Sequence, residues 1–279
     1  MFFRFYPPTP ALKPHIQAYM VMHVHTGERS APIEKPFPAG PDQCLYFYAR
    51  DEVRSVKNTN GLPVSACPSI IVGPQVTRVN LLLYPDHLTV AVFFRPGGLH
   101  RLLGGIPMTE LLDFSLDSAL IWPSDIRELN EQLANTDNYD LMAALVEGFL
   151  VRQYARNNLR IDPMDKALQL MLHPPHVLSI EQLADISCLS TRQFRRKFYE
   201  KMGLSPKVFA RIVRFNRAFR LKEKNPQLDW LDIICLAGYH DFKHLLRDFK
   251  EFSHSTPALL LEAEQKHNIR IYSAAGLTF

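Results

Sequence analysis

The chain has 279 residues, of which 47% are hydrophobic and 22% are charged. This length and composition predict a globular protein of about two domains and exclude a disordered or fibrous chain. The net charge is only +4, but 178–257 holds 15 Lys and Arg against 9 Asp and Glu (+6), and the remainder holds 17 against 19 (−2). Such a basic segment is typical either of a solvated face or of a surface for a polyanionic partner.

The start of the chain, MFFRFYPPTP, lacks the basic, apolar and small-residue regions of a secretory signal peptide. No stretch approaches about 18 uninterrupted apolar residues, so we expect neither a membrane span nor a membrane partner. The cysteines are scattered without a CxxC pair and are predicted to be reduced and mostly buried: Cys44, Cys67, Cys188 and Cys235. We therefore expect a cytoplasmic protein.

The first 107 residues show the pattern of a β domain. Short apolar runs bounded by Pro, Gly, Asp or Asn predict strands at 43–49, 68–73, 78–84 and 87–94. Several such runs favour an antiparallel barrel or sandwich. Farther along, the apolar period becomes helical in 123–133, at Ile126, Leu129 and Leu133, and in 139–154, at Leu141, Leu145 and Phe149.

The segment 178–206 predicts two short helices separated by a turn. Ser179 with Gln182, and Ser190 with Gln193, match the capping box that starts a helix. Leu189 would pack on the first turn of the second helix as a hydrophobic staple. This pattern is typical of a helix-turn-helix unit.

The second of these helices has two different sides. At about 100° per residue, Phe194, Phe198 and Met202 share one side, which would be anchored in a core. The opposite side carries Arg192, Arg195, Arg196 and Tyr199. Arginine suits guanine edges and phosphates, although a solvated basic face has the same pattern.

A second copy follows at an offset of 51 residues. Apolar anchors and basic positions recur together: Phe194 maps to Leu245, Phe198 to Phe249, Arg192 to Lys243 and Arg196 to Arg247. Gly238 marks the turn and Asp241 the start of the second helix. We predict that its buried side is formed by Phe242, Leu245, Phe249 and Phe252, and its outer side by Lys243, Arg247 and Lys250.

The two copies are joined by a predicted linker helix. Ser205 would be its N-cap, and Pro206 occupies the first helical position, where its missing N–H costs nothing. Recognition helices held about 34 Å apart would enter successive major grooves of B-DNA. A rigid linker would then force the DNA to bend.

The C-terminal hundred residues resemble the AraC/XylS family of bacterial transcription regulators. The resemblance is carried by RRKFYEKMGLSPKVF and by AGYHDFKHLLRDFKEFSHSTP. It implies a base-reading set made of Arg192, Arg195, Arg196, Phe242, Lys243, His244 and Arg247. We add Gln193, Tyr199 and Lys250 on the same two helices to the predicted DNA-binding residues. The chain departs from the family pattern at Phe242, Lys243 and Leu245, and also at His254, where the turn requires a positive φ.

The N-terminal half resembles more loosely a sensor-type domain found ahead of such DNA-binding domains. The similar pieces are PALKPHIQAYMVM, PFPAGPDQCLYFY, IIVGPQ and AVFFRPGGLHRLLG. The resemblance implies a cupin-like barrel followed by dimerising helices.

Some residues are candidates for a metal site, for ligand contact or for redox sensing. His23, His25 and Glu28 could form a metal site on a strand, but their spacing favours surface or barrel-lining histidines. Arg95 begins an RPGG turn, in which glycine supplies an unusual φ. Together with His23 and His25, it is a weak candidate for ligand contact. Cys188 and Cys235 are predicted to be buried and not redox-sensing.

These observations predict an α+β chain with a cupin-like β-barrel or sandwich and two helices, followed by two helix-turn-helix modules joined by a linker helix. The predicted domains are 1–157 for sensing and dimerisation and 158–264 for DNA binding, with a tail at 265–279. The predicted function is a transcription regulator, without catalysis or cofactor, whose partner is double-stranded DNA. A small-molecule effector, a second copy and, for an activator, RNA polymerase are further expected partners. The alternatives are a cupin-type metal enzyme with an accessory helical domain, and a protein-binding module.

Overall fold

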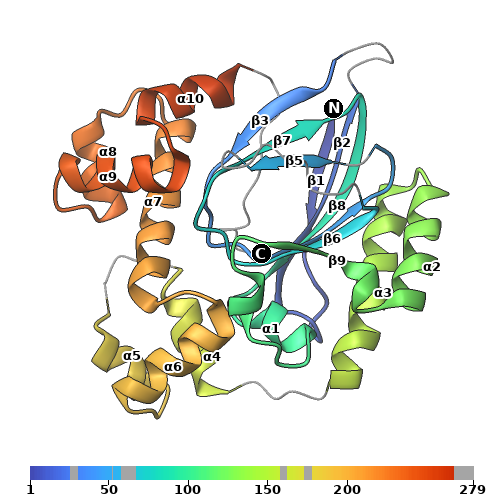
Figure 1. Cartoon of the computed structure of the whole chain (residues 1–279), viewed down its shortest axis with the longest axis horizontal. Coiled ribbons are helices and arrows are strands. Elements are labelled where there is room, and N and C mark those ends of the chain that lie inside the picture. The colour runs from blue at the N-terminus through green and yellow to red at the C-terminus, as the bar shows by residue number, and fades with distance from the viewer. Residues whose placement is uncertain (26–30, 52, 58–66, 158–161, 173–177, 267–279) are drawn as a thin grey trace.

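The computed structural model describes residues 1–25, 31–51, 53–57, 67–157, 162–172 and 178–266. A β-rich N-terminal half stands beside an all-helical C-terminal half, which curves along one side of it (Figure 1). The predicted fold class is therefore confirmed.

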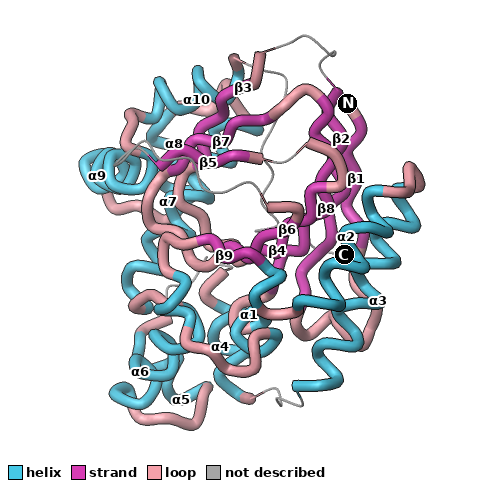
Figure 2. The backbone as a smooth tube through the Cα atoms, turned by 45° about the vertical axis from the view of Figure 1, so that its right-hand side comes forward, coloured by secondary structure: helices cyan, strands magenta, loops and turns pink. Residues whose placement is uncertain are grey.

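Two antiparallel sheets form the N-terminal half. One sheet has six strands in the order β1-β2-β8-β4-β6-β9, and the other has three in the order β3-β7-β5. The strands are β1 Phe2–Tyr6, β2 Ile16–His25, β3 Ile33–Phe37, β4 Cys44–Tyr48, β5 Arg54–Lys57, β6 Ser69–Val72, β7 Val79–Leu83, β8 Asp86–Phe94 and β9 Ser115–Asp117. The smaller sheet stands over one end of the larger one (Figure 2).

The four strands predicted from the sequence are β4, β6, β7 and β8. The long strand β2 was not recognised as a whole because both of its faces are buried. Tyr19 and Val21 point into the core under the helices, whereas Met20 and Met22 belong to the core between the sheets. Burial on both faces removes the alternation of polar and apolar residues that marks a half-exposed strand.

The helices α2 Pro123–Ala134 and α3 Tyr139–Asn157 cover the outer face of the larger sheet, as Figure 2 shows. In α2 the predicted row is buried: Ile126, Leu129 and Leu133. In α3 Phe149 is buried but Leu141 is 45% exposed, so the predicted register was wrong at that end. The shorter elements of this half are α1 Gly98–Leu102, η1 Met108–Leu111 and η2 Ser118–Leu120.

The C-terminal half consists of α4 Pro163–Leu170, α5 Ile180–Ile186, α6 Thr191–Met202, α7 Pro206–Lys224, α8 Trp230–Ala237, α9 Phe242–Ser253 and α10 Pro257–Gln265. Two helix-turn-helix modules, α5–α6 and α8–α9, are joined by α7, as predicted. One core beneath both modules is rich in phenylalanine: Phe194, Phe198, Phe209, Phe215, Phe219, Phe249 and Phe252 are at most 1% exposed. No helix within the described residues is long and apolar enough to span a bilayer.

A buried ion pair joins the two halves near the first module. The Arg101 guanidinium of α1 donates to Asp165 Oδ2 of α4 at 2.5 Å, and both side chains are about 5% exposed. Lys201 of α6 adds a second cation, with its Nζ 3.3 Å from Asp165 Oδ1. Arg101 also donates to Nδ1 of His15 at 3.0 Å, and burial together with Arg101 lowers the pKa of His15 to about 4.

A second contact joins the halves near the second module. Lys35 of β3 is fully buried, and its Nζ donates to the Glu264 carbonyl of α10 at 2.9 Å. The Ala39 N–H donates to the Phe252 carbonyl at the end of α9, at 3.0 Å. The N-terminal half therefore holds the helical half at two separate places.

We predict that Arg101→Leu lowers the free energy of unfolding by about 3 kcal/mol, because it leaves the Asp165 carboxylate buried without its nearest cation. Urea denaturation of the full chain would measure the loss. The control is Arg127→Ala on the exposed side of α2, which removes the same charge and should change stability by less than about 0.5 kcal/mol. Equal stability of both variants would show that the buried pair contributes little.

Candidate nucleic-acid interface

The recognition helix α6 is fixed at its start and along its inner side. Ser190 Oγ accepts from the Gln193 N–H at 3.3 Å, and Gln193 Oε1 accepts from the Ser190 N–H at 3.0 Å. This is the predicted capping box, which satisfies N–H groups that a helix start leaves open. Phe194, Phe198 and Met202 are at most 1% exposed, so this side is held in the core.

The opposite side of α6 is open to solvent. All of the residues predicted to contact DNA on this helix are exposed: Arg192, Gln193, Arg195, Arg196 and Tyr199. Within the described residues, no carboxylate forms an ion pair with any of the three arginines. Their guanidinium groups are therefore available to an external anion.

The second recognition helix, α9, is built in the same way. The Asp241 side chain accepts from the His244 N–H at 2.8 Å and so caps the helix. Leu245, Phe249 and Phe252 are buried as predicted, and His254 ends the helix at φ 50°, the positive φ expected there. The predicted outer residues Lys243, Arg247 and Lys250 are all exposed, as is His244, which the resemblance added to the DNA-binding set.

Phe242 departs from its predicted place in the buried row. It is the first residue of α9 and is 41% exposed. Its ring centroid lies 6.3 Å from that of Trp230 on α8, which supports one edge of the phenyl ring. The position is thus at the rim of the core, where the helix begins, and the phenyl ring faces partly outward.

A buried carboxylate that the sequence analysis missed fixes the orientation of α9. Asp248 is 2% exposed and accepts from Arg211 of α7 at 2.7 Å and from the Tyr239 hydroxyl at 3.0 Å. Hydrogen bonds to Glu251 and Asp248 raise the pKa of Arg211. In the repeat of 51 residues, Asp248 occupies the position of Lys197. This change from a positive to a negative charge was the signal in the sequence that could have marked Asp248 as different.

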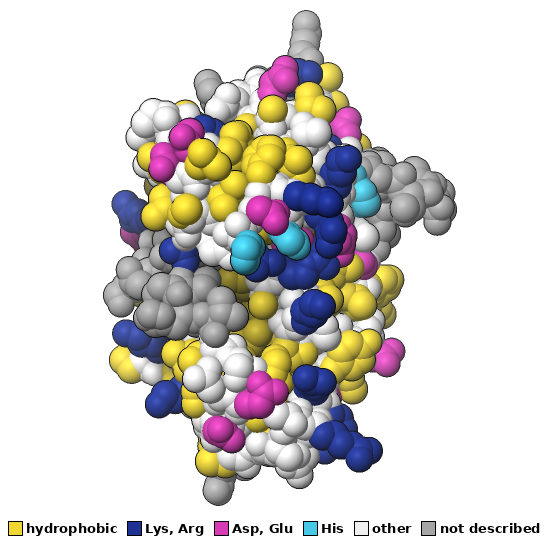
Figure 3. Space-filling view, turned by 90° about the vertical axis from the view of Figure 1, so that its left-hand side faces the viewer, with side chains coloured by type: hydrophobic (Ala, Val, Ile, Leu, Met, Phe, Trp, Pro, Cys, Tyr) yellow, Lys and Arg dark blue, Asp and Glu magenta, His cyan; other side chains and the backbone are white. Residues whose placement is uncertain are grey.

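Both recognition helices belong to the same side of the molecule. Figure 3 shows this side, with Lys and Arg side chains gathered in a band that runs from the upper module toward the lower one. Histidine side chains adjoin the band near its middle, as Figure 3 also shows. Basic side chains of the helical half thus gather on one side of the molecule.

Two cysteines contradict the prediction of burial. Cys188 and Cys235 are both exposed, whereas Cys44 is buried and Cys67 is partly buried. Cys188 lies in the tight turn of the first module with φ 54°, which turns its side chain outward. Cys235 lies on the outer side of α8, next to Leu231 and Leu236, which are 70% and 49% exposed.

The N-terminal candidates lie at the rim of the β domain. His23 and His25 do share one face, but both bond to Asp86 Oδ1, at 2.7 and 3.3 Å. The hydrogen bond from His23 lowers the pKa of Asp86. Arg95 donates from Nε to the Lys13 carbonyl at 2.8 Å, and Gly97 has the predicted positive φ, 82°. Glu28 lies outside the described residues, within which no three His, Cys, Asp or Glu side chains are grouped to hold a metal ion.

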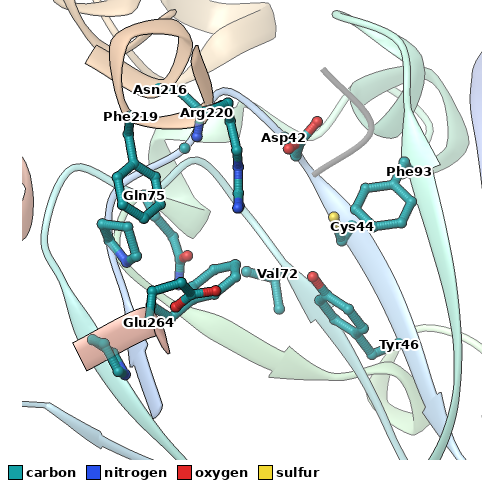
Figure 4. A pocket seen from close by; sticks show the side chains of 14 residues that line it. Asp42, Cys44, Tyr46, Val72, Gln75, Phe93, Asn216, Phe219, Arg220 and Glu264 are labelled. Carbon is teal, nitrogen blue, oxygen red and sulfur yellow. The ribbon is translucent and has the colours of Figure 1, made fainter. Parts of the chain in front are cut away.

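Two neighbouring cavities were not foreseen. The larger lies between the two sheets, with Met20, Tyr48 and His87 on one wall and Leu81 and Leu83 on the other. The smaller, drawn in Figure 4, lies between the halves: Asn216, Phe219 and Arg220 of α7 face Cys44, Tyr46 and Phe93 of the larger sheet, and Glu264 reaches in from α10. Phe37, Tyr46, Val72 and Gln75 line both cavities.

The comparisons with known proteins match the two halves separately. Residues 183–263 match the family model described as a helix-turn-helix domain, and residues 4–117 match a domain of unknown function (DUF6597). An uncharacterized HTH-type transcriptional regulator of Haemophilus influenzae is 27% identical over 165 residues. The match covers 58% of this chain and 55% of that protein, so the chain spans about half the length of this curated relative.

Two solved structures were also matched over most of the chain. ToxT of Vibrio cholerae in its unsaturated fatty acid-bound form has a TM-score of 0.49 and 12% identity, covering 91% of this chain and 98% of that one. The AraC-like transcriptional activator CuxR has a TM-score of 0.25 and 12% identity, covering 84% of this chain and 91% of that one.

The fold and its exposed basic helices define a double helix-turn-helix protein. The match over 183–263 is to a helix-turn-helix domain. The kind of domain that the resemblance implied for the C-terminal half is thereby confirmed.

We predict that thiol alkylation distinguishes the four cysteines in the native chain. Cys188 and Cys235 should react with iodoacetamide within minutes, because they are exposed, and Cys44 should react only after unfolding. Mass spectrometry of tryptic peptides would measure the modified fraction of each. Protection of Cys188 or Cys235 in the native chain would contradict the described packing of the modules.

Proposed function

We propose that this chain is a sequence-specific transcription regulator that places α6 and α9 in successive major grooves of duplex DNA. The observation that carries the proposal is the pair of capped, core-anchored helices whose basic sides are exposed on one side of the molecule. The proposed contacts are those predicted from the sequence: Arg192, Gln193, Arg195, Arg196 and Tyr199 on α6, and Phe242, Lys243, His244, Arg247 and Lys250 on α9.

The linker helix has a suitable length for this geometry. It has 19 residues, which corresponds to about 28 Å at 1.5 Å per residue. One turn of B-DNA measures about 34 Å. A stiff linker somewhat shorter than that turn favours bending of the DNA, at a cost of order 1–6 kcal/mol.

We assign a separate role to each half of the chain. Residues 1–157 would sense an effector or mediate dimerisation, 158–264 would bind DNA, and 265–279 would be a tail. The cavities suggest the route of coupling, because Phe37 and Tyr46 line both the space between the sheets and the space against α7. An effector that moves these side chains would change how α7 packs against the N-terminal half. It would thereby shift the population of DNA-competent states.

The remaining partners follow from the same proposal. The proposed regulator is a cytoplasmic protein that acts on chromosomal DNA by binding and not by catalysis. RNA polymerase is a partner if the regulator activates, and a second copy of the chain is a partner if α2 and α3 dimerise.

Arginine-to-alanine variants test the DNA-binding surface. We expect Arg196→Ala and Arg247→Ala each to weaken binding to a duplex selected from a random library by about 1–3 kcal/mol, because each loses a base or phosphate contact. Affinity would be measured by gel shift at several salt concentrations, where each lost phosphate contact lowers the slope of log K against log salt by about 1.

Arg127→Ala is the matched control, since it removes one positive charge from α2, on the opposite side of the molecule (Figure 1). Its affinity and salt slope should equal those of the wild type. If both α6 and α9 variants also equal the wild type, or if the wild type selects no duplex, the proposed function is wrong.

Phe242 should read a thymine. A phenyl ring at the start of a recognition helix can contact the C5-methyl group, an apolar feature in the major groove. We expect that replacing thymine by deoxyuridine at one position of the second half-site weakens the wild type, but not Phe242→Ala. Affinities for a set of singly substituted duplexes would reveal the position, and the same replacements in the first half-site serve as the control. Equal sensitivity of wild type and variant would exclude this role.

A further inference from the structure

The larger cavity of the N-terminal half has an apolar body and a polar end. The space free of atoms within and at the mouth of this cavity, open solvent included, is about 820 Å³. Methionine and leucine side chains form much of its wall. The polar end is made by Tyr48 of β4 and by His87 and Thr89 of β8, neighbouring strands in which Tyr48 pairs with Thr89. Gln75, Asp113 and Ser115 are further polar residues of the lining.

His87 presents a hydrogen-bond acceptor without a partner. Its side chain is 2% exposed, and Nδ1 has no hydrogen-bond partner within the described part of the chain. The Asp51 backbone bonds to the imidazole, and because the Asp51 N–H already donates to Asp86, the Asp51 carbonyl must be the group that accepts. Nε2 is therefore the donor, and Nδ1 carries the lone pair.

Charge and protonation keep this end of the cavity neutral. Burial lowers the pKa of His87 to about 4, so the imidazole is uncharged at neutral pH. Burial also raises the pKa of Tyr48, whose hydroxyl stays protonated and makes no hydrogen bond among the described residues. Thr89 already donates to the Phe47 carbonyl at 3.1 Å. The wall therefore offers an acceptor at His87 and a donor at Tyr48, whose ring centroids are 6.1 Å apart.

No Lys or Arg side chain is among the described residues that line this cavity. Its carboxylate, Asp113, is engaged through Oδ1 with the N–H groups of Val76 and Thr77, at 2.9 and 3.0 Å. An anion placed here would lose its hydration without gaining a counter-charge. A neutral ligand avoids this cost.

We propose that the cavity binds a neutral, largely apolar small molecule that carries a hydroxyl group, which donates to Nδ1 of His87 and accepts from the Tyr48 hydroxyl. The proposal rests on the proposed function, in which the N-terminal half senses an effector, and it names the chemical class of that effector.

Three probes with one ring system test the proposal on the full chain. 2-Naphthol can donate to Nδ1, 2-methoxynaphthalene cannot donate, and 2-naphthoate is an anion. By calorimetry at pH 7.5, we expect 2-naphthol to bind about tenfold more tightly than the methoxy compound, since leaving a buried acceptor unpaired costs on the order of one hydrogen bond. 2-Naphthoate should bind most weakly.

Variants identify the groups responsible. His87→Leu should reduce the preference for 2-naphthol over 2-methoxynaphthalene, while binding of the methoxy compound stays unchanged. The nearly isosteric Tyr48→Phe should weaken both compounds to a similar extent, because each presents an oxygen that accepts from the Tyr48 hydroxyl. Equal affinities of the two compounds for the wild type, tightest binding of 2-naphthoate, or no binding of any probe would overturn the proposal.

The same protein preparations would be tested for duplex selection. Intact duplex selection without 2-naphthol preference overturns this inference alone. Preference for 2-naphthol in a chain that selects no duplex supports the cavity and overturns the regulator.

Discussion

The exposed basic surface depends on the burial of aromatic side chains behind it. Phe198 of α6 packs edge-on against Phe209 of α7 at 5.7 Å, and Phe249 of α9 packs edge-on against Phe215 of α7 at 4.9 Å. Because a helix is rigid, fixing one row of each recognition helix also fixes the opposite row. A single helix, α7, receives both anchors, so it determines how the two basic rows stand relative to each other.

The N-terminal half constrains this arrangement from outside. The Arg101–Asp165 pair ties α4, near the first module, to the N-terminal half. The Lys35–Glu264 contact ties α10, near the second module, to the same half. α7 runs between these two places and closes one side of the smaller cavity. In the proposed function, such a layout would couple sensing to DNA binding, because a displacement at either contact would change the packing of a helix that both modules share.

Much of the helical half was predictable from the sequence because its signals are local. Caps at Ser190 and Asp241 and the apolar period of each helix need no knowledge of the rest of the fold. The errors arose where tertiary context decided the outcome. Cys235 is exposed although cysteine is usually buried, and Phe242 lies at the edge of a core that ends at the first turn of its helix.

The cavity could not be predicted at all. Tyr48 and His87 are 39 residues apart, and only strand register places them on one wall. Asp248 is similar, since its partners Arg211 and Tyr239 come from other elements. Contacts between single residues that are distant in the chain produce no repeating spacing of residue types, so a single sequence does not reveal them.

The end of α6 shows how tightly the two halves are fitted together. Gly203 has φ 69°, and a Cβ built there would lie 2.6 Å from the Met108 carbonyl oxygen and 2.6 Å from a Pro74 side-chain carbon. Both neighbours belong to the N-terminal half, so the helical half is not an interchangeable unit. A chimaera that joins this helical half to the N-terminal half of another protein would need open space beside Gly203 and a guanidinium group opposite Asp165.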